Sequence, residues 1–84
     1  MNLIKHIVNK KLNHISTQEL LKYSKEYEVP ITTEQADRIV ILMKGKNINI
    51  YDTQERLELL KKIAKVTSPA TAQQVNILFQ QLLK

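Results

Sequence analysis

Few residues in this sequence combine a reactive side chain with a spacing that would support catalysis or metal binding. His6 and His14 are eight positions apart, which is about 12 Å along a continuous helix at about 1.5 Å per residue, so their imidazoles cannot bind one metal ion together. Cysteine is absent from the chain, which excludes thiolate nucleophiles and cysteine ligands for zinc. We therefore expect neither a metal nor a cofactor.

The other groups with catalytic potential are better explained as features of helix ends. Glu34 and Asp37 would lie in the first turns of a helix, where the helix dipole favours negative charge. None of the serines has a neighbouring His or Lys arranged as a base. Gly45-Lys46 resembles the end of a phosphate-binding loop, but that loop needs several glycines and this chain has one. We expect no enzyme activity and no small-molecule substrate.

Lysine is the abundant residue with a potential binding role. The net charge is +5, from 13 Lys and Arg against 8 Asp and Glu, and such an excess predicts an anionic partner only where it is clustered. Residues 1–15 carry three bases and no acid, and residues 43–66 carry six bases and three acids, whereas residues 16–42 have a net charge of −2. The candidate nucleic-acid surface consists of Lys44, Lys46, Lys61, Lys62 and Lys65.

That surface also has a simpler interpretation as a solvated helix face, because Glu58 precedes two of the lysines by three and four residues, at the spacing of helix-surface ion pairs. A DNA-reading helix is disfavoured for another reason. The expected helix over residues 33–44 begins with acidic residues and is apolar over most of its circumference, whereas a recognition helix needs an exposed polar face with basic residues near its start.

Hydrophobic spacing predicts an all-α fold, a compact bundle of about five short helices. One Gly and two Pro are the strong helix breakers. Ser16 with Glu19, and Thr32 with Gln35, have the capping-box spacing that marks a helix start. Asp52 and Ser68 are N-cap candidates for the last two helices. The expected helices span residues 2–13, 17–27, 33–44, 53–66 and 69–83.

The helix over residues 33–44 is expected to be the central one, because it holds the longest apolar run, Ile39 to Met43, and ends at Gly45. The connector after it alternates polar and apolar residues, which predicts that Ile48 and Ile50 reach the core. The inward-facing residues predicted for the first and fourth helices are Leu3, Ile4, Ile7, Val8 and Leu12, and Leu57, Leu60, Ile63 and Ala64.

The last helix has a second face that carries no charge. Its apolar stripe can serve the core, while Ile77 lies on another side among glutamine residues. Depletion of charge around an apolar residue is typical of the core of a protein interface. The predicted interface consists of Gln73, Gln74, Ile77, Gln80 and Gln81, and a symmetric homodimer is its simplest use.

Length and composition indicate a single helical domain over residues 1–84. No apolar run exceeds five residues, so we expect no signal-peptide core and no membrane span. The lack of cysteine suits a reducing cytoplasm, which is the expected location.

Five segments spread over nearly the full length carry a resemblance to a known family. They are Ile4-Lys5-His6-Ile7-Val8, Leu20-Leu21-Lys22-Tyr23, Val29-Pro30-Ile31-Thr32, Gly45-Lys46-Asn47-Ile48-Asn49-Ile50, and the stretch from Ile63-Ala64-Lys65 through Thr71-Ala72-Gln73-Gln74-Val75-Asn76. In these segments the chain resembles the YqfT-like family, short proteins of Gram-positive spore-forming bacteria that are classed as a domain of unknown function. The resemblance implies a small cytoplasmic bacterial protein, and it transfers no activity or site.

Two functions remain open at this point. The first is a non-enzymatic module that binds a protein partner or a second copy of itself through the last helix. The alternative is a nucleic-acid-binding module that uses the lysine-rich surface.

Overall fold

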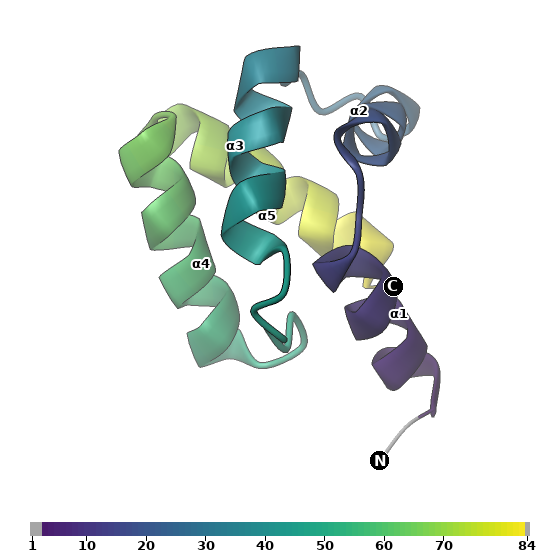
Figure 1. Cartoon of the computed structure of the whole chain (residues 1–84). Coiled ribbons are helices and arrows are strands. Elements are labelled where there is room, and N and C mark those ends of the chain that lie inside the picture. The colour runs from purple at the N-terminus through teal and green to yellow at the C-terminus, as the bar shows by residue number, and fades with distance from the viewer. Residues whose placement is uncertain (1–2, 84) are drawn as a thin grey trace.

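Five helices form the framework of residues 3–83, the part of the chain that the structure, a computed structural model, describes (Figure 1). In chain order they are α1 (Leu3–Asn13), α2 (Thr17–Glu26), α3 (Thr33–Met43), α4 (Thr53–Val66) and α5 (Pro69–Leu82). No strand occurs in this range. The all-α prediction is confirmed, and the predicted helix ends within it differ from the observed ones by at most one residue. The predicted helix start at residue 2 lies outside the described residues.

Local hydrogen bonds explain where α2 and α3 begin. The Ser16 hydroxyl accepts from the Glu19 backbone N–H, and the Glu19 carboxylate accepts from the Ser16 N–H. Thr32 and Gln35 repeat the reciprocal pair at the start of α3. Each pair provides partners for backbone donors that have none inside the helix. The N-caps of α4 and α5 are Asp52 and Ser68.

The end of α3 depends on a glycine. Gly45 has φ of +72°, the left-handed region in which a side chain is strained. The chain turns here and enters the connector to α4, as the single glycine predicts.

α3 lies between α2 and α4 and contacts both, while α4 and α5 share the largest contact between helices (Figure 1). The most deeply buried large side chains come from every part of the described chain after α1. They are Leu20, Ile39, Met43, Ile50, Leu59, Ile63, Val75, Leu78 and Phe79. The predicted central position of the third helix and the burial of Ile50 are confirmed, and Ile48 is half-buried.

α1 is attached to the connector by two asparagines one turn apart. The Asn13 side chain donates to the Ile48 carbonyl and accepts from the Ile48 N–H, both at 2.8 Å. The Asn9 side chain accepts from the Ile50 N–H at 2.9 Å. Asn13 is 4% exposed. These bonds give the backbone groups of the connector the partners that a strand would otherwise supply, so they fix the connector against α1.

Two of the predicted inward-facing residues are exposed. Leu57 is 51% exposed, and Leu59 takes its place in the core. The buried stripe of α4 is centred on Ile63, and Leu59 lies one turn before it, whereas Leu57 is about 120° away around the helix axis. Ile7 on α1 is 56% exposed rather than buried. The side chains of Leu3 and Ile4, predicted on the same stripe as Ile7, lie outside the described ones.

Candidate functional site

The exposed side of α5 is the surface that the sequence predicts as an interface, and we name it the α5 face: Gln73, Gln74, Ile77, Gln80 and Gln81. Ile77 is 45% exposed. Gln73 and Gln80 are exposed beside it, at spacings of four and three residues that place them on the same side of the helix. Gln74 and Gln81 are half-buried along one edge. The prediction therefore named a contiguous surface.

Electrostatically, α5 differs from its neighbour α4. Both helices have 14 residues, and α5 has no charged residue in its sequence PATAQQVNILFQQL. α4 has six charged residues, Glu55, Arg56, Glu58, Lys61, Lys62 and Lys65. Two helices that pack against each other thus present very different surfaces to solvent.

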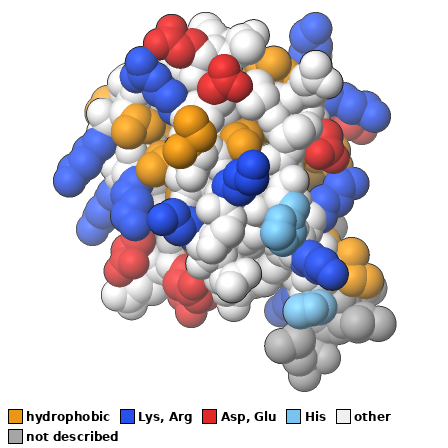
Figure 2. All heavy atoms as spheres, in the orientation of Figure 1, with side chains coloured by type: hydrophobic (Ala, Val, Ile, Leu, Met, Phe, Trp, Pro, Cys, Tyr) orange, Lys and Arg blue, Asp and Glu red, His pale blue; other side chains and the backbone are white. Residues whose placement is uncertain are grey.

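The five lysines of the candidate nucleic-acid surface, Lys44, Lys46, Lys61, Lys62 and Lys65, are all exposed, and we name them the lysine face. Figure 2 shows Lys and Arg side chains over the α4 side of this view, with Asp and Glu side chains at its borders. Among the described residues, the ion pair that forms is Arg38–Glu34, at 2.7 Å. The expected ion pairs of Glu58 with Lys61 and Lys62 on α4 therefore do not form.

An apolar patch interrupts this basic region, and the sequence did not reveal it. Ile41 is 70% exposed, and half-buried Leu42 and Val66 lie beside it. Figure 2 shows hydrophobic side chains gathered over the contact between α3 and α4, with basic side chains around them. We name the shallow groove here the α3–α4 groove; its volume is about 340 Å³, and it is lined by Arg38, Ile41, Leu42, Lys65 and Val66. Part of the apolar circumference that the sequence predicts for this helix is therefore exposed on this side.

The two histidines lie on one polar groove of about 400 Å³ between α1 and the connector. His6, Lys10 and His14 follow one another at four-residue spacing along its α1 side, and Asn47 and Asn49 line the other side. Within residues 3–83, no three His, Asp or Glu side chains come together as a metal site would require.

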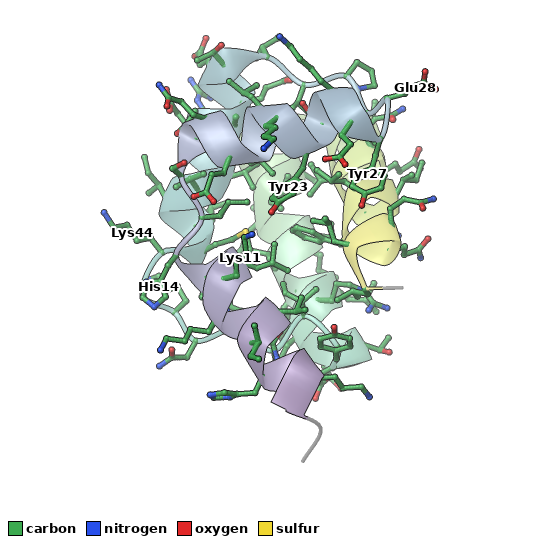
Figure 3. All side chains as sticks on the ribbon, turned by 90° about the vertical axis from the view of Figure 1, so that its right-hand side faces the viewer. Lys11, His14, Tyr23, Tyr27, Glu28 and Lys44 are labelled. Carbon is green, nitrogen blue, oxygen red and sulfur yellow. The ribbon has the colours of Figure 1, made fainter. Side chains whose placement is uncertain are left out.

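A third groove, mostly apolar and about 180 Å³ in volume, lies where α1, α2 and the end of α5 meet. Lys11 and Tyr23 point toward each other across it (Figure 3), with the Lys11 Nζ 5.7 Å from the centre of the tyrosine ring. Hydrogen bonding to Tyr23, followed by its Coulombic attraction, raises the pKa of Lys11 above 10.5. Ile7 and Leu82 also line this groove.

None of the described helices has the length and unbroken apolarity that crossing a lipid bilayer requires.

Comparisons with known proteins identify relatives of the whole chain. A family model described as "Protein of unknown function (DUF2624)" matches residues 1–83. The chain is 44% identical over 81 residues to "Uncharacterized protein YqfT" of Bacillus subtilis (strain 168), and the alignment covers 96% of each of the two chains. No solved structure matches this chain. Neither the family description nor the relative's name states a ligand or a reaction.

Proposed function

The chain belongs to the DUF2624 family of proteins of unknown function, and we propose that it is a non-enzymatic module that binds protein through the α5 face, with a second copy of itself as the simplest partner. The observation that carries this proposal is the exposure of Ile77 in the middle of a helix that has no charged residue.

Charge depletion is the specific signal, because single exposed aliphatic residues are common on proteins that bind nothing. The central part of a protein interface is depleted in charged residues, since each charge buried there would need a partner. The surface of α4, in contact with the same core, shows the ordinary composition of a solvated helix. The difference between α4 and α5 supports a role for α5 in binding rather than in solubility.

A two-fold dimer is the simplest assembly for such a surface. In a two-fold contact each residue near the axis meets its own copy or a close neighbour, so an uncharged face can be self-complementary without opposite charges on the two partners. The glutamine amides of the α5 face both donate and accept hydrogen bonds, and they can therefore pair with their own copies around Ile77.

The non-enzymatic part of the proposal is supported by what the acidic residues do. Glu34 pairs with Arg38, and Asp37 accepts a hydrogen bond from the Thr17 hydroxyl. Glu34 therefore links two turns of α3, and Asp37 links α2 to α3. These contacts are additional to the helix-dipole role that the sequence predicts for both carboxylates.

Light scattering over a series of protein concentrations tests the proposal. We expect the mass to rise from that of one chain to that of two within the micromolar range. A mass that stays at one chain up to high micromolar concentration would contradict self-association, and the α5 face would then need a different protein partner.

A further inference from the structure

The α3–α4 groove combines an apolar centre with a basic border. Ile41 on α3 is 70% exposed, whereas Ile39, two residues earlier on the same helix, is fully buried. Leu42 and Val66 extend the apolar surface into the groove. An exposed Ile alone requires no explanation, but adjacent aliphatic side chains along a groove between two helices form a surface that water solvates poorly.

Cations border this apolar centre on several sides, and the acidic residue one helical turn from Ile41 is Asp37, whose carboxylate accepts from Thr17. Arg38 and Lys65 line the groove itself. Lys44 follows Ile41 by three residues, and Lys62 precedes Val66 by four, so each lies about one helical turn from an apolar member. The groove lining contains no carboxylate, and among the described residues the lysines here form no ion pair.

Arg38 fixes one end of the groove. Its guanidinium donates to the Val66 carbonyl at 2.8 Å and to the Glu34 carboxylate at 2.7 Å, so it joins α3 to the C-terminal end of α4. A guanidinium held at two points is already ordered before a partner arrives, which lowers the entropic cost of binding. The aliphatic centre therefore lies between Arg38, whose guanidinium is paired with Glu34, and the exposed lysine side chains.

The chemistry of this surface favours one class of partner. Phosphate groups need the cations but gain nothing from Ile41, and the lining has no aromatic ring on which a base could stack. An anionic bilayer is bound by an amphipathic helix that buries its own protruding apolar face, whereas the apolar residues here line a groove between two helices. A helix-in-groove contact uses both features at once, with apolar anchors in the groove and charges at its borders.

We propose that the α3–α4 groove binds an acidic amphipathic helix of another protein, with the apolar side of that helix on Ile41, Leu42 and Val66 and its Asp and Glu residues against the surrounding lysines. The contact is independent of the α5 face. It also explains why lysines gather here without carboxylate partners: the opposite charges are supplied by the other protein.

The probe is a synthetic helical peptide with Leu at positions i, i+3, i+4 and i+7 and Glu at most of the others, titrated into isotope-labelled protein and followed by NMR. A matched peptide with Lys in place of Glu tests charge complementarity. We expect the acidic peptide to shift the amide signals of Ile41, Leu42 and Val66, and to bind more tightly than the basic one. Binding of the basic peptide with equal affinity, shifts confined to other residues, or no shift at millimolar acidic peptide would overturn the proposal.

Two variants distinguish peptide binding at Ile41 from non-specific hydrophobic binding elsewhere on the surface. Ile41→Ser should weaken peptide binding by about tenfold or more, as for a central anchor residue. Ile7→Ser, at an isoleucine exposed to 56% on α1, should leave it unchanged. Equal effects of the two changes on peptide binding would contradict the proposal. Tight binding of a uridine oligonucleotide in this groove would also contradict it if Ile41→Ser left that binding unchanged. Light scattering on the same variants reports on self-association separately.

Discussion

The side-chain amide of Asn13 forms both hydrogen bonds that a neighbouring β-strand would offer to Ile48, one to its carbonyl and one from its N–H, each 2.8 Å long. The two residues are 35 positions apart in the sequence. Together with Asn9, this buried side chain on α1 orders the connector between α3 and α4, whose next apolar residue, Ile50, is fully buried. The short connector is thus part of the core structure rather than a free loop.

Replacement of Asn13 by Leu should therefore be costly. Two part-buried backbone groups of Ile48 would lose their partner, and the buried site would hold an apolar side chain in place of an amide. A polar group buried without a partner costs about 1–3 kcal/mol. We expect the free energy of unfolding, measured by urea denaturation, to fall by at least about 2 kcal/mol on this basis. Lys10→Ala, at an exposed position on the same helix, is the control and should change it little. A loss at Asn13 no larger than at Lys10 would show that the connector does not depend on this contact.

α3 has a buried isoleucine and an exposed one two residues apart, so the same substitution at both tests the burial of each side chain. Ile39→Ala should lower the free energy of unfolding by about 2–5 kcal/mol, because a fully buried isoleucine leaves a cavity when it is truncated. Ile41→Ala, at a 70% exposed site, should change it by less than about 0.5 kcal/mol. Chemical denaturation of both variants measures the difference, and similar losses at the two sites would contradict the burial described for α3.

Binding of nucleic acid by the lysine face should be weak and independent of sequence, because lysines without base-reading partners contact phosphates only. Replacement of Lys61, Lys62 and Lys65 by Gln should reduce the slope of log affinity against log salt by about two to three, one unit or slightly less for each lost phosphate contact. Fluorescence anisotropy with RNA and DNA oligonucleotides at several salt concentrations measures both quantities. A sequence-specific, submicromolar complex at physiological salt that depends on these lysines would instead establish nucleic-acid binding as the function.

Lysine substitutions on the α5 face should separate the two copies without unfolding either. Ile77→Lys together with Gln81→Lys removes an apolar anchor and places like charges near each other across a two-fold axis. We expect light scattering to give the mass of one chain, and the melting temperature of the monomer to change little because Ile77 is partly exposed already. Gln54→Lys, at an exposed position on α4, adds charge elsewhere and should leave the mass unchanged. A sharp fall in melting temperature would mean that Ile77 packs within its own domain.

Features set by neighbouring residues could be predicted from the sequence. The capping boxes at Ser16 and Thr32 connect residues three positions apart, so their spacing alone located the starts of α2 and α3. The glycine at the end of α3 is equally local. The charge depletion of α5 is visible in the sequence for the same reason, because it is a property of one continuous helix, and the binding role of the α5 face stays a prediction.

Features that depend on which helices become neighbours could not be predicted. The Asn13–Ile48 contact joins segments whose approach no local pattern indicates. The apolar run in the sequence of α3 does not indicate which side of the helix a neighbouring helix covers. In the structure, α4 leaves Ile41 exposed. The stripe of α4 is rotated toward Leu59 for a similar reason, since this helix packs against both α3 and α5. The α3–α4 groove therefore became visible only in the folded chain.

The central claim, that the α5 face joins two copies of the chain, is tested most directly by an NMR experiment on a mixture of isotope-labelled and unlabelled protein. Only contacts between different molecules give signals in a filtered nuclear Overhauser spectrum of such a sample. At a concentration where light scattering reports two chains, we predict intermolecular signals from the Ile77 methyl groups, accompanied by Gln73 or Gln80. Intermolecular signals that come from other residues and exclude α5, or no intermolecular signal at any concentration reached, would contradict the account.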